Sequence, residues 1–114
     1  MSDRELLELA ARAVGIEGKY FESENGIHIH TGIYRPGLDY YWNPLISDSE
    51  AFRLAVKLHM EVCCRTGLCE VYFDNNGKED FISQDDGDDG ELQDEEITRR
   101  AIVRTAAEIG RQMG

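Results

Sequence analysis

Short turn motifs recur along this chain, and they restrict much of it to hairpins. Asn25-Gly26 is a strong hairpin signal because both residues tolerate positive φ. Three further turns are predicted at 35–37, 66–67 and 75–77, all of which end in glycine. The segments between the turns predict strands at 19–23, 27–34, 38–42, 69–74 and 79–83. Because the connections between successive strands are short, we expect these strands to pair antiparallel.

The remaining segments have the apolar spacing of amphipathic helices. They cover residues 2–14, 47–59 and 94–113. Ser2 and Glu5 have the spacing of a capping box, in which each side chain serves the backbone N–H of the other residue. Ser47 and Glu50 repeat that spacing. Asp94 is expected to cap the last helix.

Helical spacing also predicts which faces of the last two helices are buried. For the second helix the predicted face is Phe52, Ala55, Val56 and His59. For the last helix it is Ile102, Ala106, Ile109 and Met113. The opposite side of the last helix carries a basic stripe of Arg100, Arg104 and Arg111.

The segment 60–65 fits two interpretations: the second helix continues to Cys63, or 62–64 is a short strand. We favour the strand, because Thr66-Gly67 then forms the turn into the strand at 69–74. The predicted order is therefore α, β, β, β, α, β, β, β, α. This order indicates an α+β fold in which three helices cover an antiparallel sheet, an α-β-α sandwich. The length of 114 residues fits a single domain, 1–114.

The formal charge is −11, and one segment carries nearly all of it. From Asp74 to Glu96 there are eleven acids and one base, so the net charge there is 1 − 11 = −10. An acidic loop is expected at about 84–94, solvated because like charges repel one another. Such a charge argues against nucleic-acid and anionic-membrane partners. The argument against nucleic-acid binding is weaker for the arginine stripe of the last helix taken alone.

The N-terminus and the hydropathy pattern bear on localisation. No apolar run approaches the ~20 residues that cross a bilayer, and the chain begins with an amphipathic helix rather than a signal peptide. We therefore expect a cytoplasmic protein.

Three segments resemble a family of small proteins encoded by phages and prophages, the phage ABA-sandwich proteins. They are Trp42-Asn43-Pro44-Leu45, the segment AFRLAVKL at 51–58 and the segment RRAIVRTAAEIG at 99–110. The resemblance implies an α-β-α sandwich expressed in the cytoplasm of a bacterial host. It implies no activity and no catalytic residue.

The acidic loop suggests two functions besides solubility. Residues 85–96 approach the spacing of an EF-hand calcium loop, although Gly87 occupies one ligand position and a strand precedes the loop. The candidate calcium ligands are Asp85, Asp89, Glu91 and Glu96. Alternatively, the loop docks onto a basic surface of a host protein, as an inhibitor of a host defence system would. The candidate docking residues are Asp85, Asp86, Asp88, Asp89 and Glu91, with Tyr34 and Tyr40 as exposed aromatic anchors.

Other groups of residues give weaker evidence of a function. Cys63, Cys64 and Cys69 with His59 contain the ligand types of a zinc site, but adjacent cysteines on a strand point to opposite faces, and buried thiols explain them as well. His28 and His30 share a strand face and are candidates for a small metal-dependent enzyme. The sequence has no phosphate-binding glycine loop and no nucleophile elbow, which disfavours an enzyme. Trp42 is expected in the core. A further alternative function is a symmetric homo-oligomer, formed through a sheet edge or through the aromatic residues.

Overall fold

The computed structural model describes residues 1–24, 30–87 and 90–113 of the chain. The helices are α1 (Asp3–Val14), α2 (Asp48–Lys57) and α3 (Asp94–Gln112). The strands are β1 (Lys19–Phe21), β2 (Gly32–Arg35), β3 (Tyr40–Trp42), β4 (Glu61–Arg65), β5 (Leu68–Asn75) and β6 (Lys78–Asp85). The α+β class and the predicted order of elements are confirmed, and so is the strand at the ambiguous segment 60–65.

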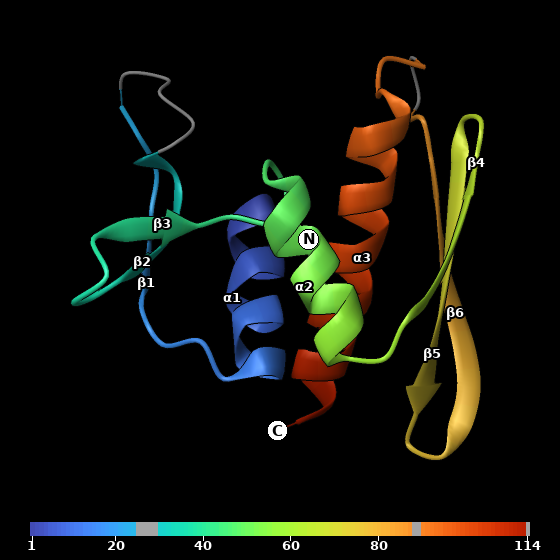
Figure 1. Cartoon of the computed structure of the whole chain (residues 1–114), viewed down its shortest axis with the longest axis horizontal. Coiled ribbons are helices and arrows are strands. Elements are labelled where there is room, and N and C mark those ends of the chain that lie inside the picture. Colours follow the sequence, from blue (N-terminus) through green and yellow to red (C-terminus); the bar gives the residue numbers. More distant parts are fainter. Residues whose placement is uncertain (25–29, 88–89, 114) are drawn as a thin grey trace.

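The strands form two three-stranded antiparallel sheets, ordered β1-β2-β3 and β4-β5-β6. Figure 1 shows the helices between the two sheets, with α1 beside the first sheet and α3 beside the second. The layering is therefore sheet, helices, sheet, rather than one sheet between layers of helices. The physical reason is that α2 separates β3 from β4 in the sequence, and each half of the chain closes its own sheet over a different side of the helices.

Two of the predicted turns have the backbone conformation that their residues favour. Asn76 and Gly77 both have positive φ, 54° and 88°, and connect β5 to β6. The Thr66-Gly67 turn connects β4 to β5, with Arg65 opposite Leu68. The predicted turn at Asn25-Gly26 lies outside the described residues.

Helix α3 is the central element of the core, which explains why it is buried on more than one side. It packs against α1, α2 and the second sheet. Its buried side chains include Ile97, Val103 and Thr105, and the Thr105 hydroxyl donates a hydrogen bond to the Ala101 carbonyl oxygen at 2.8 Å. The first sheet contributes Trp42, only 4% exposed, which confirms its predicted burial.

The predicted helix caps are correct in part. At α1 the capping box of Ser2 and Glu5 is present as predicted. The prediction that Asp94 caps α3 is wrong, because the cap is Gln93, whose backbone N–H donates to the Glu96 carboxylate at 3.4 Å. Asp94 instead accepts a hydrogen bond from the Gly67 N–H at 3.0 Å, which ties the β4–β5 turn to the start of α3.

The predicted basic stripe of α3 contacts other parts of the protein. Arg100 donates to Asp3 of α1 at 2.8 Å, and Arg104 donates to the Ser83 carbonyl oxygen of β6 at 2.9 Å. Arg111 pairs with Glu108 of its own helix. The guanidinium groups of Arg100 and Arg104 thus connect α3 to α1 and β6.

The predicted buried face of α3 is correct for Ile102 and Ala106 and wrong for Met113, which follows the helix and is exposed. Each helix within the described residues is too short or too polar to cross a lipid bilayer.

Candidate functional site

Helix α2 carries two overlapping apolar stripes, and the fold buries only one of them. Ala51, Leu54 and Ala55 face the core. Phe52 and Val56, one turn apart, remain 68% and 57% exposed. The predicted buried face of this helix is therefore wrong for Phe52 and Val56. It is also wrong for His59, which lies beyond the end of the helix with φ of 54° and is exposed.

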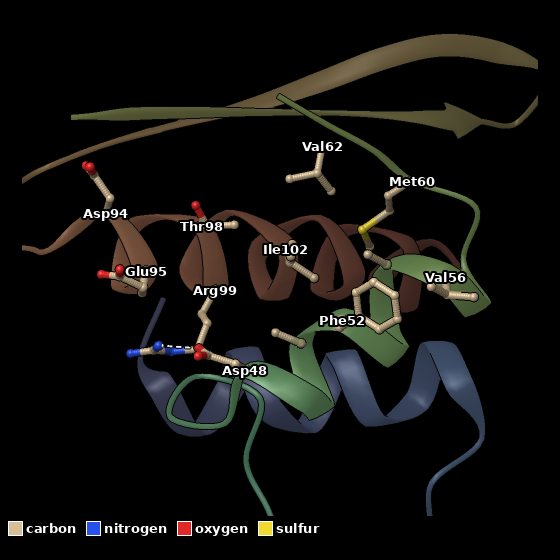
Figure 2. A pocket seen from close by; sticks show the side chains of 12 residues that line it. Asp48, Phe52, Val56, Met60, Val62, Asp94, Glu95, Thr98, Arg99 and Ile102 are labelled. Atoms are coloured by element: carbon tan, nitrogen blue, oxygen red, sulfur yellow. Dashed lines mark hydrogen bonds and ion pairs between the residues drawn. The ribbon is translucent and has the colours of Figure 1, made fainter. Parts of the chain in front are cut away.

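The exposed stripe borders a groove between α2 and β4, with α3 as its floor (Figure 2). We call it the α2–β4 groove; its volume is about 500 Å³. The apolar lining consists of Ala51, Phe52, Ala55, Val56, Met60, Val62 and Ile102. Met60 is placed by the turn after α2, where its N–H donates to the Ala55 carbonyl oxygen at 2.9 Å. Val62 follows on the inner face of β4, where its neighbour on β5 is the buried Val71.

The polar lining of the α2–β4 groove lies at the N-terminal end of α3. It comprises Asp48, Asp94, Glu95, Thr98 and Arg99. Arg99 is its one cation within the described residues, and it is held by Asp48 at 2.6 Å and by the Leu45 carbonyl oxygen at 2.8 Å. Three acids and one base leave a net charge of 1 − 3 = −2. The groove is thus an apolar trough with an acidic end.

The arrangement of the groove is suited to binding a segment that is both apolar and basic. Apolar walls take up large side chains, and carboxylates at one end attract Lys or Arg. Within the described residues, no three His, Cys, Asp or Glu side chains are grouped so that they could hold a metal ion. Sequence reasoning missed the groove because the periodicity assigned Phe52 and Val56 to the core. The competing stripe through Ala51 and Leu54, with the same spacing, was the available signal.

The predicted docking acids lie at the end of β6 and in the loop that follows it. Asp85 is the last residue of β6, and its carboxylate accepts a hydrogen bond from the Gly87 N–H at 3.0 Å. Asp86 is half-buried and Glu91 is exposed. Asp88 and Asp89 lie outside the described residues.

The calcium prediction involves the same loop. Of its candidate ligands, Asp89 lies outside the described residues and Glu91 is exposed. Glu96 accepts a hydrogen bond from the Gln93 N–H at the start of α3. Strand β6, not a helix, precedes the loop, as expected from the sequence. Calcium binding stays a prediction.

The two tyrosines predicted as anchors lie on opposite faces of the first sheet. Tyr34 is on the outer face, where its ring contacts Phe21 and Tyr41 with centroid distances of 6.1 and 5.1 Å. Tyr40 packs against the core and receives a hydrogen bond from Arg35 at 3.2 Å. This sheet lies across the helices from the described part of the acidic loop (Figure 1), so the structure does not bring the tyrosines together with those docking acids that it describes.

The three cysteines differ in burial, and the structure describes only one of the two predicted histidines. Cys69 is buried, Cys63 is half-buried and Cys64 is exposed, with its sulfur 3.5 Å from the Thr98 hydroxyl. His30 is exposed, and its ring lies 5.7 Å from that of Tyr41. His28 lies outside the described residues, so the pair of histidines stays a prediction.

Comparisons with protein-family models, with curated proteins and with solved structures found no match for this chain. The α2–β4 groove is therefore interpreted from its own geometry and charge.

Proposed function

We propose that this protein is a non-catalytic binding module that holds a segment of another protein in the α2–β4 groove. The segment combines large apolar side chains with Lys or Arg. The observation that carries the proposal is the exposure of Phe52 and Val56 beside an acidic rim. Exposed apolar patches bordered by polar groups are typical of protein-binding sites.

The charge distribution supports a basic partner. The segment 74–96 carries −10 of the total charge of −11, and β4, which forms one wall of the groove, belongs to the same sheet as β5 and β6. A field of this sign accelerates association with a basic protein and makes the association sensitive to salt.

We further propose that the partner is a protein of a bacterial host and that the protein acts in the host cytoplasm. The resemblance of three segments to phage-encoded sandwich proteins supports this origin. Inhibition of a host defence system is the role that we propose for the complex.

Selection of random displayed peptides on the immobilised protein tests the chemistry of the groove, and it works with a partner that has yet to be identified. We expect the selected sequences to combine large apolar residues with Lys or Arg, and to bind more weakly as salt is added. Selection of neutral or acidic sequences whose binding ignores salt would contradict the proposal.

A pair of matched variants locates the binding site. Phe52→Ser removes the exposed ring at the groove, whereas Phe81→Ser removes a ring that is 51% exposed on β6. Both rings are exposed, so we expect both variants to fold. We expect Phe52→Ser to weaken binding of the selected peptides by about tenfold or more, and Phe81→Ser to leave it unchanged. Equal effects of the two substitutions would place the binding site elsewhere.

A further inference from the structure

Two of the three cysteines face each other across the β4–β5 hairpin. Arg65 and Leu68 close the two-residue turn, and the next pair in the register is Cys64 and Cys69. Residues that close a two-residue turn exchange hydrogen bonds, so the next pair is a non-hydrogen-bonded pair with a Cα separation of ~4.5 Å. That separation lies within the range of about 4.4–6.8 Å that a disulfide spans.

Both thiols lie on the face of the hairpin that packs against α3. Cys69 is fully buried, and the Cys64 sulfur contacts the Thr98 hydroxyl of α3. Cys63, one residue earlier, has the opposite orientation because side chains alternate along a strand. The hairpin therefore brings together Cys64 and Cys69 and leaves Cys63 apart.

The two thiols differ in accessibility. Cys64 is exposed. Burial raises the pKa of the Cys69 thiol to about 11, and the adjacent Cys64 contributes to the rise. Because Cys69 is buried and its thiol is seldom ionised, a reagent in solution reacts first with the exposed Cys64, and Cys69 reacts second, within the protein.

We propose that Cys64 and Cys69 are a reversible disulfide site whose oxidant is a small disulfide of the glutathione type. The Cys64 thiolate attacks one sulfur of the oxidant, and a glutathione thiolate leaves and takes up a proton. Cys69 then loses its proton to solvent and attacks the Cys64 sulfur, which releases a second glutathione. Two protein thiols are thereby oxidised to one disulfide while one glutathione disulfide is reduced to two thiols.

The site adjoins the α2–β4 groove but does not depend on the function proposed for it. Thr98 lines the groove, and Val62, two residues before Cys64, forms part of its wall. Oxidation would join β4 to β5 beside that wall and move the Cys64 sulfur from its contact with Thr98.

Thiol counting on the full-length protein tests the proposal. The reduced protein is incubated with glutathione disulfide at mildly alkaline pH, free thiols are blocked with iodoacetamide, and the intact mass is measured. We expect iodoacetamide to label one thiol and to leave the other two unlabelled, with no glutathione attached. After treatment with dithiothreitol, we expect all three thiols to be labelled. The proposal would be overturned if iodoacetamide labelled all three thiols of the oxidised sample, if a glutathione adduct persisted on Cys64, or if disulfide-linked dimers formed.

Variants and digestion assign the bond. Trypsin cleaves after Lys57, Arg65 and Lys78, so the disulfide joins peptide 58–65 to peptide 66–78. Because the first of these peptides contains both Cys63 and Cys64, the assignment uses Cys63→Ser, in which we expect the link to form normally. In Cys64→Ser, an exposed substitution that should not disturb folding, we expect no intramolecular link. A link that survives Cys64→Ser and disappears in Cys63→Ser would contradict the pairing.

Discussion

At the scale of single residues, Glu50 joins the end of β3 to the start of α2. Its carboxylate accepts a hydrogen bond from the backbone N–H of Asn43 at 2.7 Å. Asn43 is itself buried, and its side chain donates to the Thr31 carbonyl oxygen and accepts from the Leu45 N–H. Burial raises the pKa of the Glu50 carboxyl, although the Asn43 hydrogen bond and nearby Arg53 act to lower it.

The raised pKa of Glu50 predicts a pH dependence of stability. A folded state that binds this proton more tightly than the unfolded chain gains stability as the pH falls through the interval between the unfolded and folded pKa values. Above that interval the partly buried charge opposes folding. Glu50→Gln keeps an acceptor oxygen and removes the titration. We therefore expect the wild type to gain stability relative to Glu50→Gln as the pH is lowered from about 7 to about 4.

Urea unfolding of both proteins across this pH range measures the difference, and other titrating groups cancel in the comparison. A wild type that loses stability relative to Glu50→Gln on acidification would contradict the prediction.

These residues also show which contacts a local sequence pattern predicts and which it does not. The spacing of Ser47 and Glu50 correctly predicts that the Ser47 hydroxyl accepts from the Glu50 N–H, observed at 3.3 Å. The reciprocal bond of the capping box is replaced by the bond to Asn43. The first contact depends only on helix geometry, whereas the second depends on how the chain enters the helix, which the spacing does not specify.

At the scale of elements, α2 shows why periodicity alone did not find the groove. The stripes through Leu54 and through Phe52 have the same spacing, so each satisfies the test for an amphipathic helix. Ala55 belongs to both stripes, and the structure buries it together with Ala51 and Leu54. Which stripe is buried is a property of the packing between elements.

The contact between α1 and α3 depends on the missing side chain of Gly110. This residue is buried in α3, and a Cβ atom placed on it would lie 1.9 Å from the Leu9 carbonyl oxygen of α1. Such a distance is impossible between non-bonded atoms, and the obstacle is backbone that cannot rotate away. The two helices therefore approach at this point as closely as glycine allows.

Gly110→Ala is predicted to destabilise the protein despite the better helix propensity of alanine. Propensity alone would add up to ~1 kcal/mol of stability. Separation of the helices outweighs this gain, since overpacking a close contact costs about 1–3 kcal/mol and here involves backbone. We expect a net loss of about 1–2 kcal/mol, measured by urea unfolding. Arg53→Ala, at an exposed position of α2, is the control and should change stability by less than about 0.5 kcal/mol. A stabilised Gly110→Ala would show that α1 and α3 do not meet closely here.

At the scale of the whole molecule, the order of elements was predictable and their layering was not. Hairpin turns specify which strands pair locally, and α2 divides the strands into two groups of three. Whether the groups merge into one sheet depends on contacts that are distant in sequence. The groove, which lies between α2, β4 and α3, could not be predicted for the same reason.

The second sheet places acidic side chains from within and outside the segment 74–96 on one face. Alternation along the strands places Glu61, Glu70, Asp74, Glu79 and Asp85 on the outer face of the second sheet, opposite the buried Cys69, Val71 and Phe73. Arg65 shares that face and pairs with Glu70 at 3.8 Å. Glu61 and Glu79 border one shallow hollow with Asp74. Three carboxylates of the segment 74–96 therefore share this sheet face with two carboxylates from outside the segment, and their mutual repulsion opposes folding.

Salt is predicted to stabilise the protein by screening this face. The Debye length is ~10 Å at about 0.1 M salt and shorter above it, so added sodium chloride weakens repulsion between neighbouring carboxylates. We expect the unfolding temperature to rise with salt, and to rise less in the double variant Glu61→Gln/Glu79→Gln. The matched control is Glu17→Gln/Glu24→Gln, which removes the same charge from exposed positions around β1. Equal salt responses of the two variants would mean that total charge, rather than its concentration on the second sheet, determines the repulsion.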